Sequence, residues 1–318
     1  MRYSVVSRFR GTLLGAILGE SLASNRETKS ESCLHFGKMA ILGTKSLITL
    51  GRLDLNDWIA LQHKEYPHLD ATDISSIEVI LATLPVALFF HDNTIKLRQN
   101  LLRVLQIWED DPVVRDGTLA IGYAIAQSLN EKLHPLTLIP QTISFLGETP
   151  TSVPQQLLKV HALLTQGSGL ERAQAELNRE EKLSNIIAMA FYCFLSTLED
   201  FRLAVLRATH SSNSQVQETT RLSLQATGAI TGALSGAYNS TEGIPVNWWG
   251  LVSQANLTTR GLTNFSQMLE LADALLAVWS GVYDFTLNPS ELKEDRCAIF
   301  LDVAPLSVYA APRVIRSR

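Results

Sequence analysis

The chain has 318 residues, of which 46% are hydrophobic and 18% charged, a composition typical of a globular protein with a sizeable core. Its formal net charge of −4 argues against nucleic-acid binding as the main function, since domains with that function are usually basic. The three cysteines form no C-x-x-C pair, which argues against a disulfide framework or a zinc site and favours a cytoplasmic location.

The opening residues predict a buried helix over 8–23. A basic start precedes an apolar stretch that ends at Glu20, but no small-residue cleavage site follows, so we do not expect a signal peptide. Gly11, Gly15 and Gly19 fall on one face of this helix, a spacing that lets a neighbouring helix approach closely. No run of 18 apolar residues occurs in the chain, so we expect no transmembrane segment.

Helical periodicity dominates the rest of the chain, which predicts an all-α fold, a compact orthogonal bundle of many helices. Asp54 is expected to cap a short helix that contains Trp58, and Asp116 to start another helix. The remaining predicted helices cover residues 39–51, 74–91, 95–108, 117–130, 154–165, 169–179, 182–208, 222–238 and 263–283.

The end of the chain has a different character. β-branched and aromatic residues cluster in CAIFLDVAPLSVYA, so we predict a helical domain over 1–285 and an irregular or β-like C-terminal extension over 286–318. Arg313, Arg316 and Arg318 give this extension a basic end. They are candidates for docking on an acidic partner surface, with a solvated terminus as the alternative.

Four segments carry a resemblance to a known family. RFRGTLLGAILGESLA resembles the first helix of the ADP-ribosylglycohydrolase family, of the dinitrogenase-reductase-activating type. DGTLAIGYAIA and LEDFRLAVLRATH resemble its middle helices, and TGAITGALSGAYNSTEGIPVNWW resembles its late helix with the Ile-Pro turn and Trp that follow. The resemblance covers about 8–283 and implies that family's all-helical fold.

The resemblance also implies where two magnesium ions would bind for hydrolysis of an ADP-ribosyl bond. The family takes its ligands chiefly from a Thr-Asp-Asp-Thr motif before the second helix and an Asp-Thr-Asp-Thr motif before the late helix, because such cations need anionic oxygens. Here the first motif aligns with Leu34, His35, Phe36 and Gly37, none of which is a carboxylate or a hydroxyl.

The second motif can be aligned in two ways, and neutral side chains stand at its positions in both. The family's Asn-Gly turn beside the ribose is also missing, since residues 76–82 take its place. We therefore expect the magnesium ions, and hydrolysis that depends on them, to be absent. The second-motif positions are Ser223, Leu224, Gln225 and Ala226 in one alignment and Asn213, Ser214 and Gln215 in the other.

Three residues remain as weak catalytic candidates. Glu20 replaces the family's Asp after the first helix, and Glu27 lies eight residues after Gly19, where relatives carry a glutamate that contacts the ribose or metal. His35 stands at a vacated metal position and could act as a base. With these residues the alternative function is metal-independent hydrolysis of ADP-ribosyl or related N/O-glycosidic bonds, although Glu27 as a solvated loop residue and His35 as a filler are plainer interpretations.

The function that these losses favour is binding rather than chemistry. We predict a degenerate, catalytically inactive member, a pseudoenzyme that acts as a binding, regulatory or assembly scaffold with another protein as partner. Trp248 and Trp249 are candidate anchors for that partner, with core packing as the alternative. A non-hydrolysing reader of ADP-ribose or a nucleotide is the second alternative.

Overall fold

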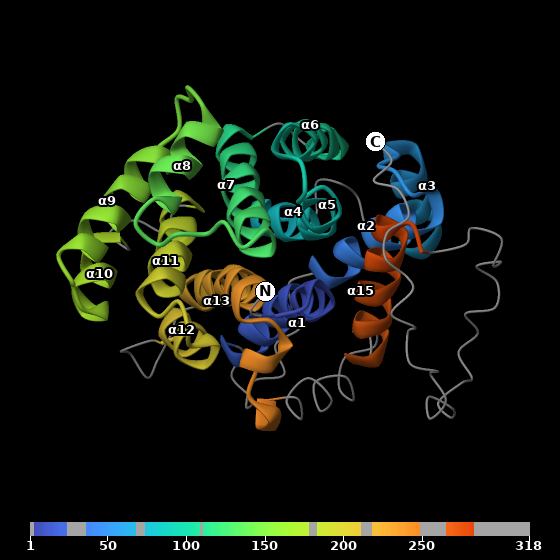
Figure 1. Ribbon diagram of the computed structural model, residues 1–318. Helices are drawn as coiled ribbons and strands as arrows, with labels where there is room; N and C mark the ends of the chain where they lie inside the picture. The colour runs from blue at the N-terminus through green and yellow to red at the C-terminus, as the bar shows by residue number, and fades with distance from the viewer. Residues whose placement is uncertain are drawn as a thin grey trace.

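The computed structural model describes residues 3–23, 36–67, 74–108, 111–177, 183–210, 218–248 and 265–282. In Figure 1, α1 and α13 lie in the middle of the bundle, with α9 and α10 towards one end and α3 and α15 towards the other. The predicted C-terminal extension and its boundary lie outside the described residues.

The helices are mostly short and follow one another through brief turns. In chain order they are α1 (Val5–Ala23), α2 (Phe36–Leu50), α3 (Leu55–Glu65), α4 (Ser76–Ala82), α5 (Leu84–Phe89), α6 (Thr94–Val104), the 3₁₀ turn η2 (Leu105–Ile107), α7 (Pro112–Leu129), α8 (Leu138–Leu146), α9 (Val153–Thr165), α10 (Leu170–Leu177), α11 (Leu183–Ser196), α12 (Phe201–Ala208), α13 (Glu218–Asn239), the 3₁₀ turn η3 (Thr241–Gly243) and α15 (Phe265–Ser280).

The α1–α13 pair forms the centre of the bundle, and its two helices touch backbone to backbone. A Cβ atom built on Gly15 would lie 2.1 Å from the Gly232 carbonyl oxygen, and one built on Gly232 would lie 1.9 Å from that of Gly15. The close approach predicted for the glycine face of the first helix is therefore confirmed. The antiparallel pairs are Gly11 with Gly236, Gly15 with Gly232, and Gly19 with Gly228.

Two long predicted helices are each divided in two. The segment 74–91 breaks at Thr83, because Pro85 begins the next helix and lacks the N–H that a continuous helix would need. The segment 182–208 breaks after Ser196, and the Asp200 carboxylate starts α12 by accepting a hydrogen bond of 2.9 Å from the Leu203 amide.

Helix α8 was not predicted from the sequence. Pro140 interrupts its apolar pattern, but it occupies the first turn, where a backbone N–H has no partner within the helix. The predicted cap of α3 is confirmed, since the Asp54 carboxylate accepts from the Asn56 amide at 3.1 Å.

The prediction for Asp116 is wrong. Helix α7 starts at Pro112, and Asp111 is its cap, accepting from the Val113 amide at 2.8 Å. Asp116 lies in the second turn, 1% exposed, where its carboxylate accepts hydrogen bonds from the hydroxyls of Thr149 and Thr151. It therefore ties α7 to the turn before α9.

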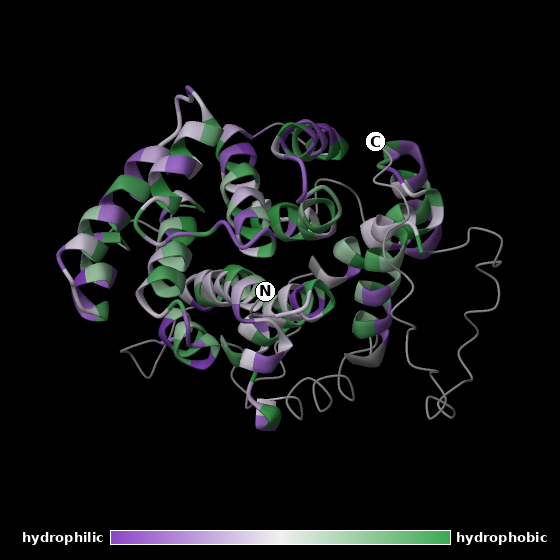
Figure 2. Ribbon diagram, viewed as in Figure 1, coloured by the Kyte–Doolittle hydropathy of each residue, from purple (hydrophilic) through white to green (hydrophobic). Residues whose placement is uncertain are grey.

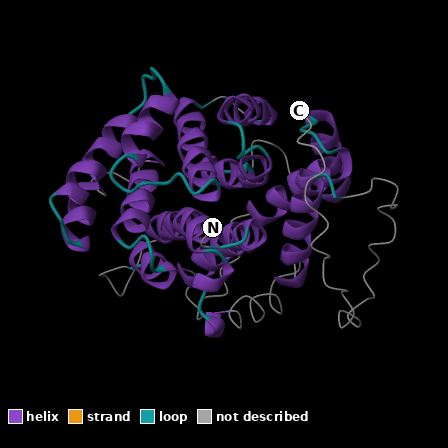
Figure 3. Ribbon diagram, viewed as in Figure 1, coloured by secondary structure: helices purple, strands orange, loops and turns teal. Residues whose placement is uncertain are grey.

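Hydrophobic residues line the inside of this bundle, while hydrophilic residues mark the outer faces of α6, α9 and α10 (Figure 2). The described part of the chain contains helices, turns and loops and no strand (Figure 3), which confirms the all-α fold. None of its helices is long and apolar enough to cross a membrane.

Candidate functional site

The register of α1 against α13 brings two predicted site segments together. Gly19 contacts Gly228, so one turn further along each antiparallel helix Ala23 reaches the level of Leu224. The last turn of α1, with Glu20, therefore lies beside the second turn of α13, with Gln225. Both side chains are largely buried, Glu20 at 8% and Gln225 at 2% exposure.

The positions aligned with the second metal motif lie inside α13 in one of the two alignments. Since α13 starts at Glu218, Ser223 and Gln225 follow a complete helical turn. The Ser223 hydroxyl donates to the Thr219 carbonyl at 3.1 Å, and the Ser223 carbonyl accepts from the Thr227 hydroxyl at 2.8 Å. Ser223 is thus engaged within its own helix. The other alignment, over 213–215, lies outside the described residues.

A helix stands where the family's ribose-side turn is expected. Ser75 and Glu78 form a capping box at the start of α4: the Glu78 carboxylate accepts from the Ser75 amide at 2.7 Å, and the Ser75 hydroxyl accepts from the Glu78 amide at 3.4 Å. Glu78 is buried. The Ser-x-x-Glu spacing was the signal in the sequence for this helix start, and the sequence analysis missed it.

Aliphatic side chains fill the junction of α4, α7 and α11. A Cβ atom built on Gly117 of α7 would lie 2.9 Å from Cδ1 of Ile80 and 2.5 Å from Cδ1 of Ile187. The remaining space at this junction is therefore apolar and tightly packed. Within the described ranges no group of three or more His, Cys, Asp or Glu side chains is arranged to hold a metal ion.

The other predicted site residues are only partly placed. Phe36 is the first residue of α2, and Trp248 is buried with its ring 6.1 Å from that of Phe201 in an edge-on contact. Trp248 therefore packs in the core, which was the alternative to a role as a partner anchor, and it offers no surface anchor. Glu27, Leu34, His35, Trp249, Arg313, Arg316 and Arg318 lie outside the described residues.

Of the three cysteines, Cys193 on α11 lies within the described ranges, and its thiol has low reactivity. The thiol is fully buried, and burial raises its pKa to about 12. Because the thiolate is the reactive form, Cys193 is not a nucleophile at neutral pH.

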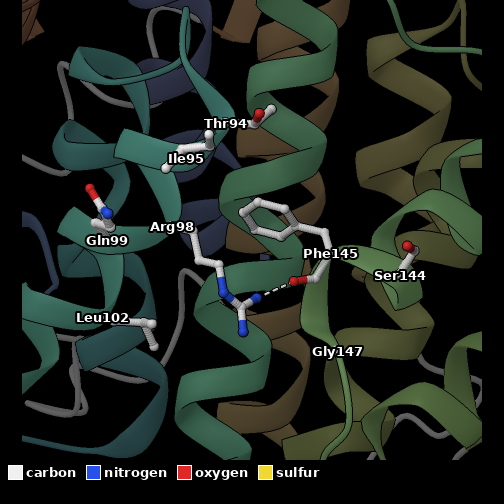
Figure 4. A pocket seen from close by; sticks show the side chains of 8 residues that line it. All are labelled: Thr94, Ile95, Arg98, Gln99, Leu102, Ser144, Phe145 and Gly147. Carbon is white, nitrogen blue, oxygen red and sulfur yellow. Dashed lines mark hydrogen bonds between the residues drawn. The ribbon is translucent and has the colours of Figure 1, made fainter.

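An open groove of about 540 Å³ runs between α6 and α8 (Figure 4). Arg98 lies in it with both terminal nitrogens engaged: they donate to the carbonyls of Phe145 and Leu146 at the end of α8. Phe145 stacks on Tyr123 with ring centres 4.6 Å apart. Arg98 thus satisfies the C-terminal carbonyls of α8, which is a structural role. The groove is lined by Thr94, Ile95, Arg98, Gln99, Leu102, Ser144, Phe145 and Gly147.

Comparison with known proteins shows to which family this chain belongs. The family model described as ADP-ribosylglycohydrolase matches residues 42–284, which is most of the chain. The chain belongs to the ADP-ribosylglycohydrolase family. A solved structure titled "ADP-ribosylglycohydrolase-related protein complex" is similar with a TM-score of 0.58 and 16% identity, covering 86% of this chain and 99% of that chain, so the two share a fold. A search of curated proteins found no match.

For a member of the ADP-ribosylglycohydrolase family, the described part of the site is poor in ligands for magnesium. A divalent cation of this kind takes mainly carboxylate oxygens. At the α1–α13 end the described second-motif positions supply a hydroxyl and an amide, from Ser223 and Gln225, and the Glu78 carboxylate is engaged by the backbone of α4. The described second-motif positions thus offer no carboxylate, while the buried Glu20 carboxylate lies at the same end of the α1–α13 pair.

Proposed function

We propose that this chain is a catalytically inactive member of the ADP-ribosylglycohydrolase family that uses the helical bundle as a binding or assembly scaffold. The observation that carries the proposal is the position of Ser223 and Gln225 inside α13, with the Ser223 hydroxyl bonded within the helix. A neutral hydroxyl or amide cannot offset the cost of dehydrating a divalent cation. The neutral residues Leu34, His35 and Phe36 at the first motif support the same proposal.

Metal-independent hydrolysis, the alternative, receives little support from the described carboxylates. Cleavage of a glycosidic bond normally needs two carboxyl groups that flank the bond. Glu78 is held in a capping box and Asp116 by two threonine hydroxyls. Glu20 and Glu27 would have to supply both groups, with His35 as a further base.

A protein is the partner that we propose. The similar solved structure carries the word "complex" in its title, which is consistent with an assembly role for this fold. Trp249 and the basic residues Arg313, Arg316 and Arg318 remain the predicted contacts, and a cytoplasmic location remains a prediction.

Calorimetric titration of the full chain with ADP-ribose, with and without Mg²⁺, tests the proposal. We expect no binding heat in either condition and no release of ADP-ribose from an ADP-ribosylated substrate. Mg²⁺-dependent binding would contradict the proposal and restore a metal-dependent hydrolase. Binding without Mg²⁺ and without turnover would identify a reader instead.

A matched variant tests the remaining alternative, metal-independent hydrolysis. If the chain does release ADP-ribose without Mg²⁺, Glu27→Gln decides whether the Glu27 carboxylate is responsible. Loss of turnover in Glu27→Gln, with an unchanged thermal unfolding midpoint, would establish metal-independent hydrolysis. Glu171→Gln on α10, far along the chain from both motifs, is the control.

A further inference from the structure

A buried histidine lies where three helices meet. His91 follows α5 and is 3% exposed. Its ring centre lies 5.5 Å from that of Phe9 on α1 and 4.8 Å from that of Trp279 on α15. Since the Phe9 and Trp279 ring centres lie 6.4 Å apart, the three rings form a triangle in which the imidazole contacts both the first and the last described helix.

The hydrogen bonds around His91 fix the tautomer of its neutral ring. Nδ1 lies 2.6 Å from the Leu88 carbonyl oxygen, which can only accept, so Nδ1 carries the hydrogen and Nε2 is the unprotonated nitrogen. The Asn130 amide donates to the His91 carbonyl at 2.7 Å and holds the backbone in place. Since both the ring and the backbone are held, acid brings a second proton to Nε2 inside an aromatic cage.

The exposed Asp92 beside His91 favours a proton on the ring, but its effect is smaller than that of burial. Arg8 and Arg10 flank Phe9 on α1, so the nearest charges on that helix are cations, and each is paired with a carboxylate, Glu131 or Asp273. Helix α5 carries no ionisable residue. The other charged residues on these elements are Glu20 on α1, Lys38 and Lys45 on α2, Arg115 and Asp116 on α7, Lys132 after α7, and the exposed Glu270 on α15.

Burial lowers the pKa of His91 from its ordinary value of 6.5, and this effect outweighs the hydrogen bond to Leu88 and the charge of Asp92, which act in the opposite direction. A histidine that regains water therefore binds a proton more strongly than His91 does in the folded chain. By linkage, packing of the cage is fully stable above the ordinary histidine pKa and loses stability as the pH falls below it.

We propose that His91 is an acid-sensitive latch: the cost of burying a charged imidazolium at this junction outweighs its attraction to the Trp279 ring, so protonation of Nε2 releases α15 from the bundle. Helix α15 packs on α1, α2 and α5 through Met268, Ala272, Leu275 and Val278, and it shares the Arg10–Asp273 ion pair with α1. It makes no comparable contact with α13. Release of α15 therefore leaves the α1–α13 pair in place and uncovers one side of α1 and α2. This inference does not depend on the proposed scaffold function.

Hydrogen exchange of the full chain, followed by mass spectrometry and corrected for the intrinsic rate at each pH, tests the latch. Between about pH 7.5 and pH 5, exchange in peptides that cover α15 should become faster, by at most about thirtyfold, which is the limit that an ordinary histidine pKa sets. Peptides from α9 and α11 should keep their protection. His91→Phe, which retains an aromatic ring in the cage, should remove the change in α15.

Two results would overturn the latch: α15 protection that does not change with pH in the wild-type chain, or an equal loss of protection in His91→Phe. His134→Gln, a change at an exposed histidine before α8, should leave the pH response of α15 unaltered. If circular dichroism shows that His91→Phe is unfolded, His91→Gln replaces it, with the same expected loss of pH response.

Discussion

Helix α1 meets its two main neighbours in opposite ways. Towards α13 it presents glycines, so that carbonyl oxygens of one helix lie where side chains of the other would be. Towards α15 it presents Phe9, whose ring contacts those of His91 and Trp279, and Arg10, which forms an ion pair with Asp273. One contact is made by backbone and the other by side chains.

This difference determines how each contact can change. A backbone contact has no rotamers and no ionisable groups, so its geometry is insensitive to pH and salt, and any added atom disturbs it. A side-chain contact can be adjusted one group at a time. We infer that the α1–α13 pair sets the fold, while the α15 contact is the part that conditions can regulate.

The largest effect should come from Gly15→Ala. The new methyl group would lie 2.1 Å from the Gly232 carbonyl oxygen and 3.1 Å from the Phe201 ring, so the helices must move apart. We expect a loss of at least about 3 kcal/mol in the free energy of unfolding, measured by urea denaturation. Gly169→Ala, at a position with no atom within 4 Å, is the control; because Gly169 directly precedes α10, where alanine is a poorer cap, it should cost no more than about 1 kcal/mol. Wild-type stability in Gly15→Ala would show that the backbone contact is not rigid.

A smaller and more local effect is expected for Trp279→Leu. Leucine keeps part of the apolar contact but removes the tilted ring contacts with His91 and Phe9, at a cost of about 1.5 kcal/mol. Hydrogen exchange should place this loss in α15 and spare α13. Trp279→Phe, which retains a ring, should cost clearly less. Equal loss of protection in α13 would mean that the two contacts of α1 are not independent.

The smallest effect should come from Arg10→Gln. The Arg10 and Asp273 side chains are 36% and 41% exposed, and ion pairs at such positions contribute about 0.2–1 kcal/mol. A double-mutant cycle with Asp273→Asn measures the coupling, which should decrease as salt is raised. A large coupling energy that does not depend on salt would show that this ion pair behaves like the rigid α1–α13 contact instead.

The sequence predicted the fold better than the site. Periodicity located most helices, and the spacing of Gly11, Gly15 and Gly19 predicted a close helix contact. It did not identify α13 as the partner, because spacing on one helix carries no information about which distant segment packs against it. Short interruptions were hard to recognise: Pro85 and Pro140 both lie in the first turn of a helix, but Pro85 divides a predicted helix and Pro140 belongs to a helix that was not predicted.

For the site, the family motifs indicated which positions to inspect but not their local structure. Counting back from the late helix aligned Ser223 and Gln225 with a motif that precedes the helix in the family, whereas the predicted helix over 222–238 and α13 itself both cover them. Asp116 looked like a cap because it precedes Gly117, and only tertiary structure brings Thr149 and Thr151 to its carboxylate. Such contacts between distant segments leave no local pattern in a single sequence.

The glycine pairs also set the order of events during synthesis. Helix α1 leaves the ribosome first, but α13 follows only after about 200 further residues, which take roughly 10–40 s at about 5–20 residues per second. Until then the glycine face of α1 has no neighbour that fits it. The central pair must therefore close late, over a long stretch of chain, which makes its formation slow. A nascent chain that stops before α13 should leave α1 available to chaperones and proteases.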